Sequence, residues 1–392
     1  MEIKRLSSKN YDELLDLLNT VFANKYGRDM DFLSEQPKMW VCDDEHMQKH
    51  FGVFEDGRLV AVSGIYPLSV KIGDKTLKFA TTGNVATHPD YEGRGYFSAT
   101  FGRAMEELPI LGIDVARLGG ARQRYARYGY EPAGSIYRFS FCTDNRIKYF
   151  ADRGGNVEFK RIVKEDTEAL TYADTLARKS KIYVERSHNE NCRDVFLALS
   201  TKHSVPYLAL RDGEPIGYLS AYANRQFVGY SEWGTNISEI RAESTDAFAD
   251  MVCAYQKKVD ASILFSLPPY MTEELKLFSK GAEAVSVFSP THLKVMNYEA
   301  LADALMNIKD SSTMLEGKAV IEIAGYGKLC FYNRDSERGV KKCDLPALLT
   351  LDKLSATRLL FGHLPPYEIM EKSPLLASWL PLPMSWDTLD YV

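Results

Sequence analysis

The sequence has no long apolar run and no apolar signal core at its beginning. No stretch approaches the roughly eighteen apolar residues that a membrane helix requires, and the chain starts Met1-Glu-Ile-Lys-Arg-Leu6. These absences exclude a membrane span and a secretory signal within the sequence. We therefore expect a cytoplasmic protein.

Paired cysteines and basic blocks are also missing. The six cysteines lie far apart, without a Cys-x-x-Cys pair, which favours reduced and buried thiols. The net charge is −5 and no run of Lys and Arg stands out, so the sequence excludes a general nucleic-acid binder and is compatible with cationic substrates. A length of 392 residues is enough for two or three domains.

The signature motifs of several enzyme classes are absent as well. The sequence contains no His-Glu-x-x-His, no Gly-x-x-x-x-Gly-Lys-Ser/Thr loop and no Ser, His and Asp in an order typical of hydrolases. His46 and His50 have the i, i+4 spacing of a metal pair, but no third ligand lies near them. We expect both on a solvated helix face and no metal in the protein.

What the sequence does contain is a strand, a glycine-bearing turn and a helix in succession. A strand-forming run at 79–87 leads through Gly93 and Gly95 into a helical pattern at 97–108. The first N–H groups of a helix lack intrahelical partners and lie at the positive end of its dipole. Such a turn favours an anion, for example a pyrophosphate, and Arg94 could add a charge-assisted contact.

A second strand-like run, at 113–118, leads through Gly119-Gly120 to the sequence Tyr125-Ala-Arg-Tyr128-Gly129-Tyr130. In the order and spacing of both pieces, the chain resembles the GNAT superfamily of N-acetyltransferases. In that superfamily the acyl-CoA loop follows strand four, and a short helix ends in an aromatic-Gly-aromatic turn. The resemblance is closest to the enhanced-intracellular-survival type and covers most of the chain.

The phosphate loop departs from the superfamily pattern at two positions. That pattern reads Gln/Arg-x-x-Gly-x-Gly/Ala, whereas this chain reads Glu92-Gly-Arg-Gly95-Tyr-Phe97. A bulky residue such as Phe97 is also found in the enhanced-intracellular-survival group. Glu92 replaces a residue that contacts a phosphate in the superfamily.

The sequence also carries signs of a duplication. Two Asp-Gly turns, at Asp56 and Asp212, each join two strand-like runs and lie 156 residues apart (212 minus 56). The same offset aligns the phosphate loop with 243–252, which has several acids and no glycine. We expect tandem GNAT domains, the first of which uses the strand and helix at 3–24 to shape its acceptor cleft. The second is expected to be catalytically silent.

The pattern changes from about residue 289. We expect a strand and a helix within 292–305, a hairpin within 318–332, two helical segments within 345–361 and an extended, proline-rich tail from Pro365. This part resembles the sterol carrier protein-like domain that ends the same group of acetyltransferases.

The expected fold class is α/β (α+β), with mixed central sheets flanked by helices. The expected divisions are an active GNAT domain at 1–150, a degenerate GNAT domain at 151–288, and a sterol carrier protein-like domain with its tail at 289–392.

The resemblance implies acetyl-CoA as the co-substrate. The backbone of strand four would present N–H groups to the thioester carbonyl and to the pantetheine arm. The residues that the resemblance assigns to cofactor binding are Val85, Ala86, Thr87, Gly93, Arg94, Gly95, Tyr96, Phe97 and Ser98.

Two tyrosines have rival claims to protonate the departing thiolate. Tyr125 aligns with the acid of many GNAT enzymes, and Tyr130 aligns with the residue given that role in the enhanced-intracellular-survival group. Either could instead be a core aromatic residue with a satisfied hydroxyl. We expect Tyr130 to be the acid, with Tyr125 as the alternative.

The resemblance places the base at the C-terminus. In the same group the C-terminal carboxylate returns to the first active site and accepts the proton of the amine, which assigns this role to Val392. Asp390 is the alternative carboxylate. The competing interpretation is that the tail only packs against the third domain.

The expected function is acetyl-CoA-dependent N-acetyl transfer to a primary amine by direct attack. The acceptor is a small molecule or a peptide, and the resemblance allows a homo-oligomer. The alternative is a non-catalytic protein that binds acyl-CoA or a lipid on the same scaffold.

Overall fold

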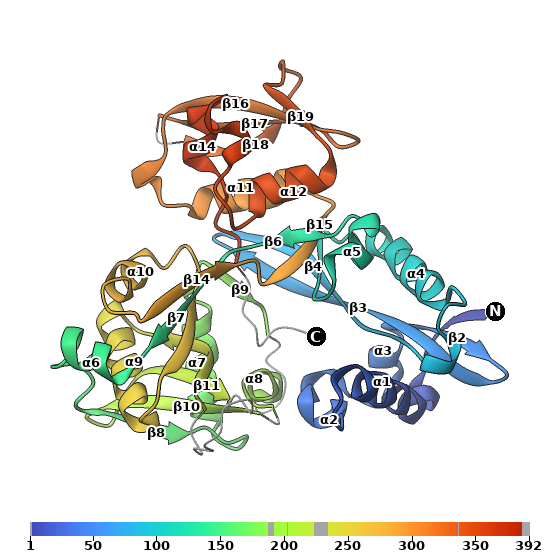
Figure 1. The fold of residues 1–392 in the computed structure, drawn as a ribbon, viewed down its shortest axis with the longest axis horizontal. Coiled ribbons are helices and arrows are strands. Elements are labelled where there is room, and N and C mark those ends of the chain that lie inside the picture. The colour runs from blue at the N-terminus through green and yellow to red at the C-terminus, as the bar shows by residue number, and fades with distance from the viewer. Residues whose placement is uncertain (1, 187–191, 202, 223–233, 336, 386–392) are drawn as a thin grey trace.

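The computed structural model describes residues 2–186, 192–201, 203–222, 234–335 and 337–385. Figure 1 shows three groups of elements, each built on its own sheet. Blue and cyan elements make up most of the first group, green and yellow elements most of the second, and orange and red elements most of the third. Within the described ranges, no helix combines the length and the hydropathy that a bilayer span requires.

The first sheet has the strand order β1-β2-β3-β4-β5-β15-β6, with β9 beside β3. Its strands and helices are β1 (Glu2–Arg5), α1 (Tyr11–Tyr26), α2 (Phe32–Glu35), α3 (Asp44–Met47), β2 (His50–Glu55), β3 (Arg58–Ile72), β4 (Lys75–Thr87), α4 (Tyr96–Ile110), β5 (Val115–Leu118), α5 (Arg122–Tyr125), β6 (Glu131–Ala133), β9 (Ile182–Val184) and β15 (Thr291–Val295).

Helices cover both faces of this sheet. On one face, Leu14 and Leu18 of α1 pack with Val62 of β3 in one apolar cluster. On the other face, Phe101 of α4 packs with Ile65 in a separate cluster. Each helix thus buries one apolar face against the sheet.

The second sheet has the order β14-β7-β13-β12-β11-β10-β8. Its elements are β7 (Ile136–Phe141), α6 (Thr143–Tyr149), β8 (Val157–Arg161), α7 (Thr167–Ala177), α8 (Arg193–Leu199), β10 (Ser204–Arg211), β11 (Glu214–Tyr222), β12 (Asn236–Ala242), α9 (Thr245–Val259), β13 (Ile263–Leu267), α10 (Thr272–Phe278) and β14 (Ala284–Phe288).

The two sheets repeat one topology and exchange one strand. Read from β1 and from β8, each sheet places a parallel pair at its centre, β4 with β5 and β12 with β13. The next strand comes from the other half of the chain, because β15 lies between β5 and β6 while β7 lies between β13 and β14. The expected first domain, 1–150, therefore contributes β7 to the second sheet, and the expected third domain, 289–392, contributes β15 to the first.

Both Asp-Gly turns adopt the geometry of tight hairpins. Asp56 and Gly57 have φ of 52° and 78°, and Asp212 and Gly213 have φ of 51° and 86°. Two successive left-handed residues match the twist of the paired strands, which join β2 to β3 and β10 to β11. The two predicted hairpins are confirmed.

The third group is a four-stranded sheet in the order β18-β17-β16-β19. Its elements are α11 (Tyr298–Ile308), β16 (Gly317–Ile323), β17 (Gly327–Arg334), β18 (Glu337–Lys342), β19 (Leu349–Leu351), α12 (Lys353–Phe361), α13 (Tyr367–Met370) and α14 (Pro374–Trp379). Leu305 of α11 and Trp379 of α14 share one buried cluster with Phe79 of the first sheet. The likeness to a sterol carrier protein-like domain stays a prediction.

Two expectations for this group are wrong. The first of the two helical segments within 345–361 is strand β19, because Leu349 pairs with Ile321 on the open edge of β16. The proline-rich tail forms two short helices instead of an extended chain. Pro374 occupies the first turn of α14, where the N–H that proline lacks would have no partner.

The expectation for His50 is also wrong. The helix that carries His46 ends at Met47, and His50 begins β2 with 1% of its surface exposed. Its Nε2 lies 2.7 Å from the hydroxyl of Tyr66, and its Nδ1 lies 3.2 Å from the carbonyl of Met47. The i, i+4 spacing therefore does not place the two imidazoles on one helix.

Candidate active site

The site begins where two parallel strands separate. Strands β4 and β5 pair only from Phe79 with Val115 to Thr81 with Arg117, whereas β4 continues to Thr87. Beyond Thr81 the backbone of β4 therefore has no β5 partner. Its polar groups on that edge are left for a ligand.

A β-bulge lies on β4 inside this opening. Val62 pairs with Ala86 and Gly64 pairs with Gly83, so β4 has one residue more than β3 between the two pairs. Asn84 takes up the bulge with φ of 52°, a left-handed conformation that asparagine adopts more readily than most residues. A bulge changes the direction in which the neighbouring backbone groups point.

A buried chain of hydrogen bonds holds the bulge. Asn84 Nδ2 donates to the Tyr66 hydroxyl at 2.6 Å, and this hydroxyl is the one that contacts His50. Burial lowers the pKa of His50 to about 4, so its imidazole is neutral at pH 7. Burial also raises the pKa of Tyr66. Hydrogen bonds among uncharged side chains therefore hold Asn84 in its left-handed conformation.

The predicted phosphate loop leads from β4 into α4. Gly93 and Gly95 have φ of 77° and 82°, and Gly95 is the N-cap residue of the 15-residue helix that begins at Tyr96. A Cβ atom at either glycine would meet no heavy atom within 4 Å. The glycines are therefore needed for backbone conformation and for an open approach to the helix N-terminus.

Two connected clefts lie along this strand and loop. The first cleft has a volume of about 730 Å³ and the second about 610 Å³. Of the predicted cofactor residues, those that line the first cleft are Val85, Ala86, Thr87, Gly93, Gly95, Tyr96, Phe97 and Ser98. The residues common to both clefts are Phe22, Lys25, Val85 and Arg124.

Arg94 has a different environment from the one expected. Its guanidinium donates to Glu55 at 3.0 Å and lies 4.9 Å from the ring centre of Tyr91. The Tyr96 hydroxyl donates to the same carboxylate. Arg94 is not among the residues that line the first cleft, although its neighbours Gly93 and Gly95 are.

The structure separates the two candidate acids. Tyr130 has no exposed surface, and its hydroxyl is 2.8 Å from Thr82 Oγ1. Tyr125 belongs to the same apolar cluster and is 6% exposed, but unlike Tyr130 it also lines the second cleft. Burial raises the pKa of both hydroxyls, while Arg124 opposes this shift at Tyr125 and Thr82 opposes it at Tyr130.

Sequence reasoning missed two cations of the site. Lys25 lies in the last turn of α1, and Arg124 lies on α5, with its guanidinium 5.5 Å from the ring centre of Phe97. Their presence in both clefts depends on how the two helices pack beside the loop. For Arg124 the sequence offered only its position next to Tyr125, at the start of the aromatic-Gly-aromatic turn.

The predicted base lies outside the described residues, which end at Ser385 before Asp390 and Val392. The last described part of the tail lies near the second cleft. Ser135 N donates to the carbonyl of Met384 at 2.8 Å, and a Cβ atom placed on the adjacent Gly134 would lie 3.4 Å from Pro290, which lines that cleft. Within the described ranges, no group of three His, Cys, Asp or Glu side chains is arranged to hold a metal ion.

Comparisons with known proteins agree with this arrangement. Residues 2–133 match the family model described as an acetyltransferase (GNAT) domain. No curated protein matches the chain.

Several solved structures share the fold over nearly the whole chain. GCN5-related N-acetyltransferases from Kribbella flavida and Anabaena variabilis align over 100% of both chains, with 18% and 16% identity and TM-scores of 0.64 and 0.66. Eis1 from Mycobacterium abscessus aligns over 99% of this chain and 98% of its own, with 14% identity and a TM-score of 0.65. At these identities the likeness is one of fold.

Proposed function

We propose that this acyltransferase, whose residues 2–133 form a GNAT acetyltransferase domain, moves the acetyl group of acetyl-CoA directly to a primary amine. The observation that carries the proposal is the opening between β4 and β5. It joins a glycine-bearing helix N-terminus to two clefts that share Val85 and Arg124. A nucleotide thioester and an amine would meet at this junction.

The first cleft suits the cofactor. Its pyrophosphate would bind the N–H groups at the start of α4, and its pantetheine arm would pair with the free edge of β4. The thioester carbonyl would then lie beside the bulge at Asn84 and receive a backbone N–H, which stabilises the developing oxyanion. Lys25 and Arg124 supply the positive charge of this cleft, because Glu92 on its wall is acidic and Arg94 is bound to Glu55.

The second cleft suits the acceptor. The nitrogen lone pair of the amine would attack the carbonyl carbon, the C–S bond would break, and the thiolate would take a proton. Of the two candidates we assign the acid to Tyr125, because it lines this cleft, whereas the Tyr130 hydroxyl is bound to Thr82 inside the core. A raised pKa keeps the Tyr125 hydroxyl protonated and ready to donate.

The amine must also lose a proton. The C-terminal carboxylate of Val392 remains our proposed base, with Asp390 as the alternative. The proposal is supported by the position of Met384, whose carbonyl accepts a hydrogen bond from Ser135 N at 2.8 Å close to Pro290. A carboxylate near the second cleft would attract a substrate ammonium and then take its proton, directly or through water.

One experiment distinguishes the enzyme from the alternative, a protein that binds acyl-CoA or a lipid without chemistry. Calorimetry measures the binding of acetyl-CoA, and a thiol-release assay measures turnover with a panel of amines that includes polyamines, aminoglycosides and peptides. The proposal requires thiol release that depends on both acetyl-CoA and one class of amine. Tight binding without turnover of any amine would favour the alternative.

A further inference from the structure

A separate cavity lies between the first domain and the third group of elements, and the acetyl-transfer proposal does not use it. Its volume is about 280 Å³. Its walls come from α5, β6, α12 and the segment that follows α12. The residues that matter for its chemistry are Arg122, Glu131, Arg358, Leu364 and Tyr367.

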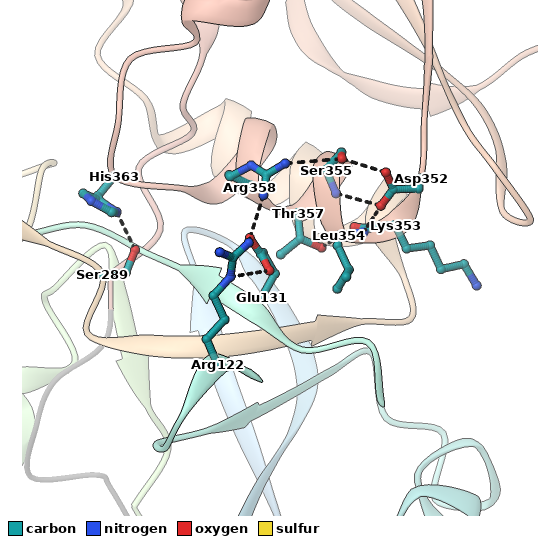
Figure 2. A network of polar contacts seen from close by, with 10 residues as sticks. All are labelled: Arg122, Glu131, Ser289, Asp352, Lys353, Leu354, Ser355, Thr357, Arg358 and His363. Carbon is teal, nitrogen blue, oxygen red and sulfur yellow. Dashed lines mark hydrogen bonds and ion pairs between the residues drawn. The ribbon is translucent and has the colours of Figure 1, made fainter. Parts of the chain in front are cut away.

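Two guanidinium groups from different domains meet one buried carboxylate on this wall (Figure 2). Arg122 donates to Glu131 through Nε at 3.1 Å and through Nη2 at 2.6 Å, and Arg358 donates through Nη1 at 2.9 Å. The carboxylate is 1% exposed, whereas the side chains of Arg122 and Arg358 are 52% and 44% exposed. Glu131 is thus satisfied, while both cations still face the cavity.

The three charged groups leave an excess of one positive charge. Each guanidinium has five N–H donors, of which Arg122 uses two on Glu131, and Arg358 uses one on Glu131 and one on Ser355. Donors therefore remain for another acceptor. A group with a single negative charge would neutralise the cavity and could bind a guanidinium in bidentate fashion, as a carboxylate does.

Apart from His363, whose Nδ1 lies 2.8 Å from Ser289 Oγ, the other side chains of the cavity are apolar, and the cavity is incompletely covered. Pro132, Leu359 and Pro366 line it beside the ion pairs. At its edge, Leu364 is 59% exposed and Tyr367 is 69% exposed. An apolar body on a bound carboxylate would cover these two side chains and gain from leaving water.

We propose that this interdomain cavity binds a small molecule in which one carboxylate is attached to an apolar body, the carboxylate lying on Arg122 and Arg358. Arg122 is also the first residue of α5, whose last residue is Tyr125. A ligand on Arg122 therefore holds the short helix that borders the second cleft. Binding itself does not depend on the proposed acetyl transfer, so each can be tested alone.

The test is a calorimetric titration of the full chain, under saturating coenzyme A, with hexanoate as the probe. Hexylamine, hexanol and inorganic phosphate serve as matched compounds. The proposal expects hexanoate to bind at least about tenfold more tightly than each of the other three, because a charged hydrogen bond and the apolar chain both contribute. Equal binding of hexanoate and hexanol, or tighter binding of phosphate, would overturn it.

Variants at the edge of the cavity test whether hexanoate binds there, and they leave the buried ion pairs intact. Leu364→Glu puts a second carboxylate beside the ligand and should weaken hexanoate binding about tenfold or more. Leu348→Glu is the control, because Leu348 is 50% exposed, belongs to the same group of elements and does not line the cavity. If both variants bind hexanoate as tightly as the parent chain, the cavity is only a gap beside a structural ion pair.

Discussion

Tyr125 and Tyr130 lie five positions apart in the sequence and have different surroundings in the structure. The Tyr130 hydroxyl contacts Thr82 in the core, and the Tyr125 ring borders the second cleft. The sequence could not distinguish them, because both belong to one aromatic turn. Which tyrosine is the better candidate for the acid depends on which ring borders the opening between β4 and β5.

The first prediction follows from this difference. Tyr125→Phe should lower kcat about 10²- to 10⁴-fold with little change in KM for acetyl-CoA, because it removes only the proton donor. Tyr130→Phe is the matched variant and should instead lower the free energy of unfolding by about 1 kcal/mol through the lost Thr82 contact. Steady-state kinetics and urea unfolding measure both effects, and the opposite pattern would assign the acid to Tyr130.

The second prediction concerns the phosphate loop. Gly95→Asp introduces a strained left-handed residue and a negative charge at the start of α4, and should raise Kd for acetyl-CoA at least about tenfold. Gly213→Asp is the control, since Gly213 has φ of 86° and open space around it but lies in the hairpin of the second sheet. Unchanged acetyl-CoA affinity in folded Gly95→Asp would mean that the phosphates bind elsewhere.

The third prediction concerns pH and the buried imidazole of His50. Its pKa is about 4 in the folded protein against 6.5 as the ordinary value, so between these pH values the unfolded chain binds the extra proton. Stability is therefore lost as the pH falls from 6.5 towards 4. Between pH 7 and pH 5 this histidine should account for a loss of about 2 kcal/mol, at about 1.4 kcal/mol per unit.

The measurement is urea unfolding of the parent and of His50→Gln at both pH values. The variant should lose less stability on acidification than the parent. The control is His46→Gln, which removes from α3 an imidazole that is 29% exposed and should lose as much stability as the parent. An equal loss in all three chains would show that His50 is not the buried titrating group.

At the scale of elements, the second sheet lacks the phosphate loop of the first. Eight residues separate β4 from α4 (88 to 95), whereas only Glu243 and Ser244 separate β12 from α9. The Ser244 side chain itself accepts from Ala247 N and so occupies the helix N-terminus that a phosphate would need. The sequence signalled this, since a segment without glycine cannot form such a loop.

The fourth prediction is that each chain binds one acetyl-CoA. Calorimetric titration should give a stoichiometry of one, and the double variant Glu243→Gln, Asp246→Asn should keep the kcat of the parent, because no phosphate loop exists there for these acids to affect. A second acetyl-CoA bound per chain would contradict this prediction.

Sequence reasoning predicted local elements better than their partners. The hairpins at Asp56 and Asp212, the strand of β4 and the helix of α4 each follow from residues that are neighbours in the chain. The positions of β15, inside the first sheet, and of β19, at the edge of the third, do not, because strands pair through backbone groups that every residue carries. The course of the tail was also missed, since Pro374 begins a helix where prolines were expected to prevent one.

At the scale of the whole molecule, the described part of the tail packs against the first sheet. Leu380, Leu382 and Met384 are buried in the cluster that also holds Phe79 of β4. The described chain therefore ends beside the domain that carries the predicted chemistry.

The fifth prediction tests the proposed base. Two glycines appended after Val392 keep every side chain and displace only the terminal carboxylate. The extended chain should lose most of its kcat and bind acetyl-CoA as before, whereas two glycines inserted after Asp335, in the turn between β17 and β18, should change neither value. Full activity of the chain extended after Val392 would rule out the terminal carboxylate as the base.

The exchanged strands also have a consequence for the order in which the protein is made. Strand β15 lies between β5 and β6, so the first sheet remains incomplete until residue 295 has left the ribosome. At translation rates of about 5–20 residues per second, more than 150 residues of delay correspond to roughly 10–30 s. During that time β5 and β6 have exposed edges, which makes the newborn N-terminal half a natural client for a chaperone.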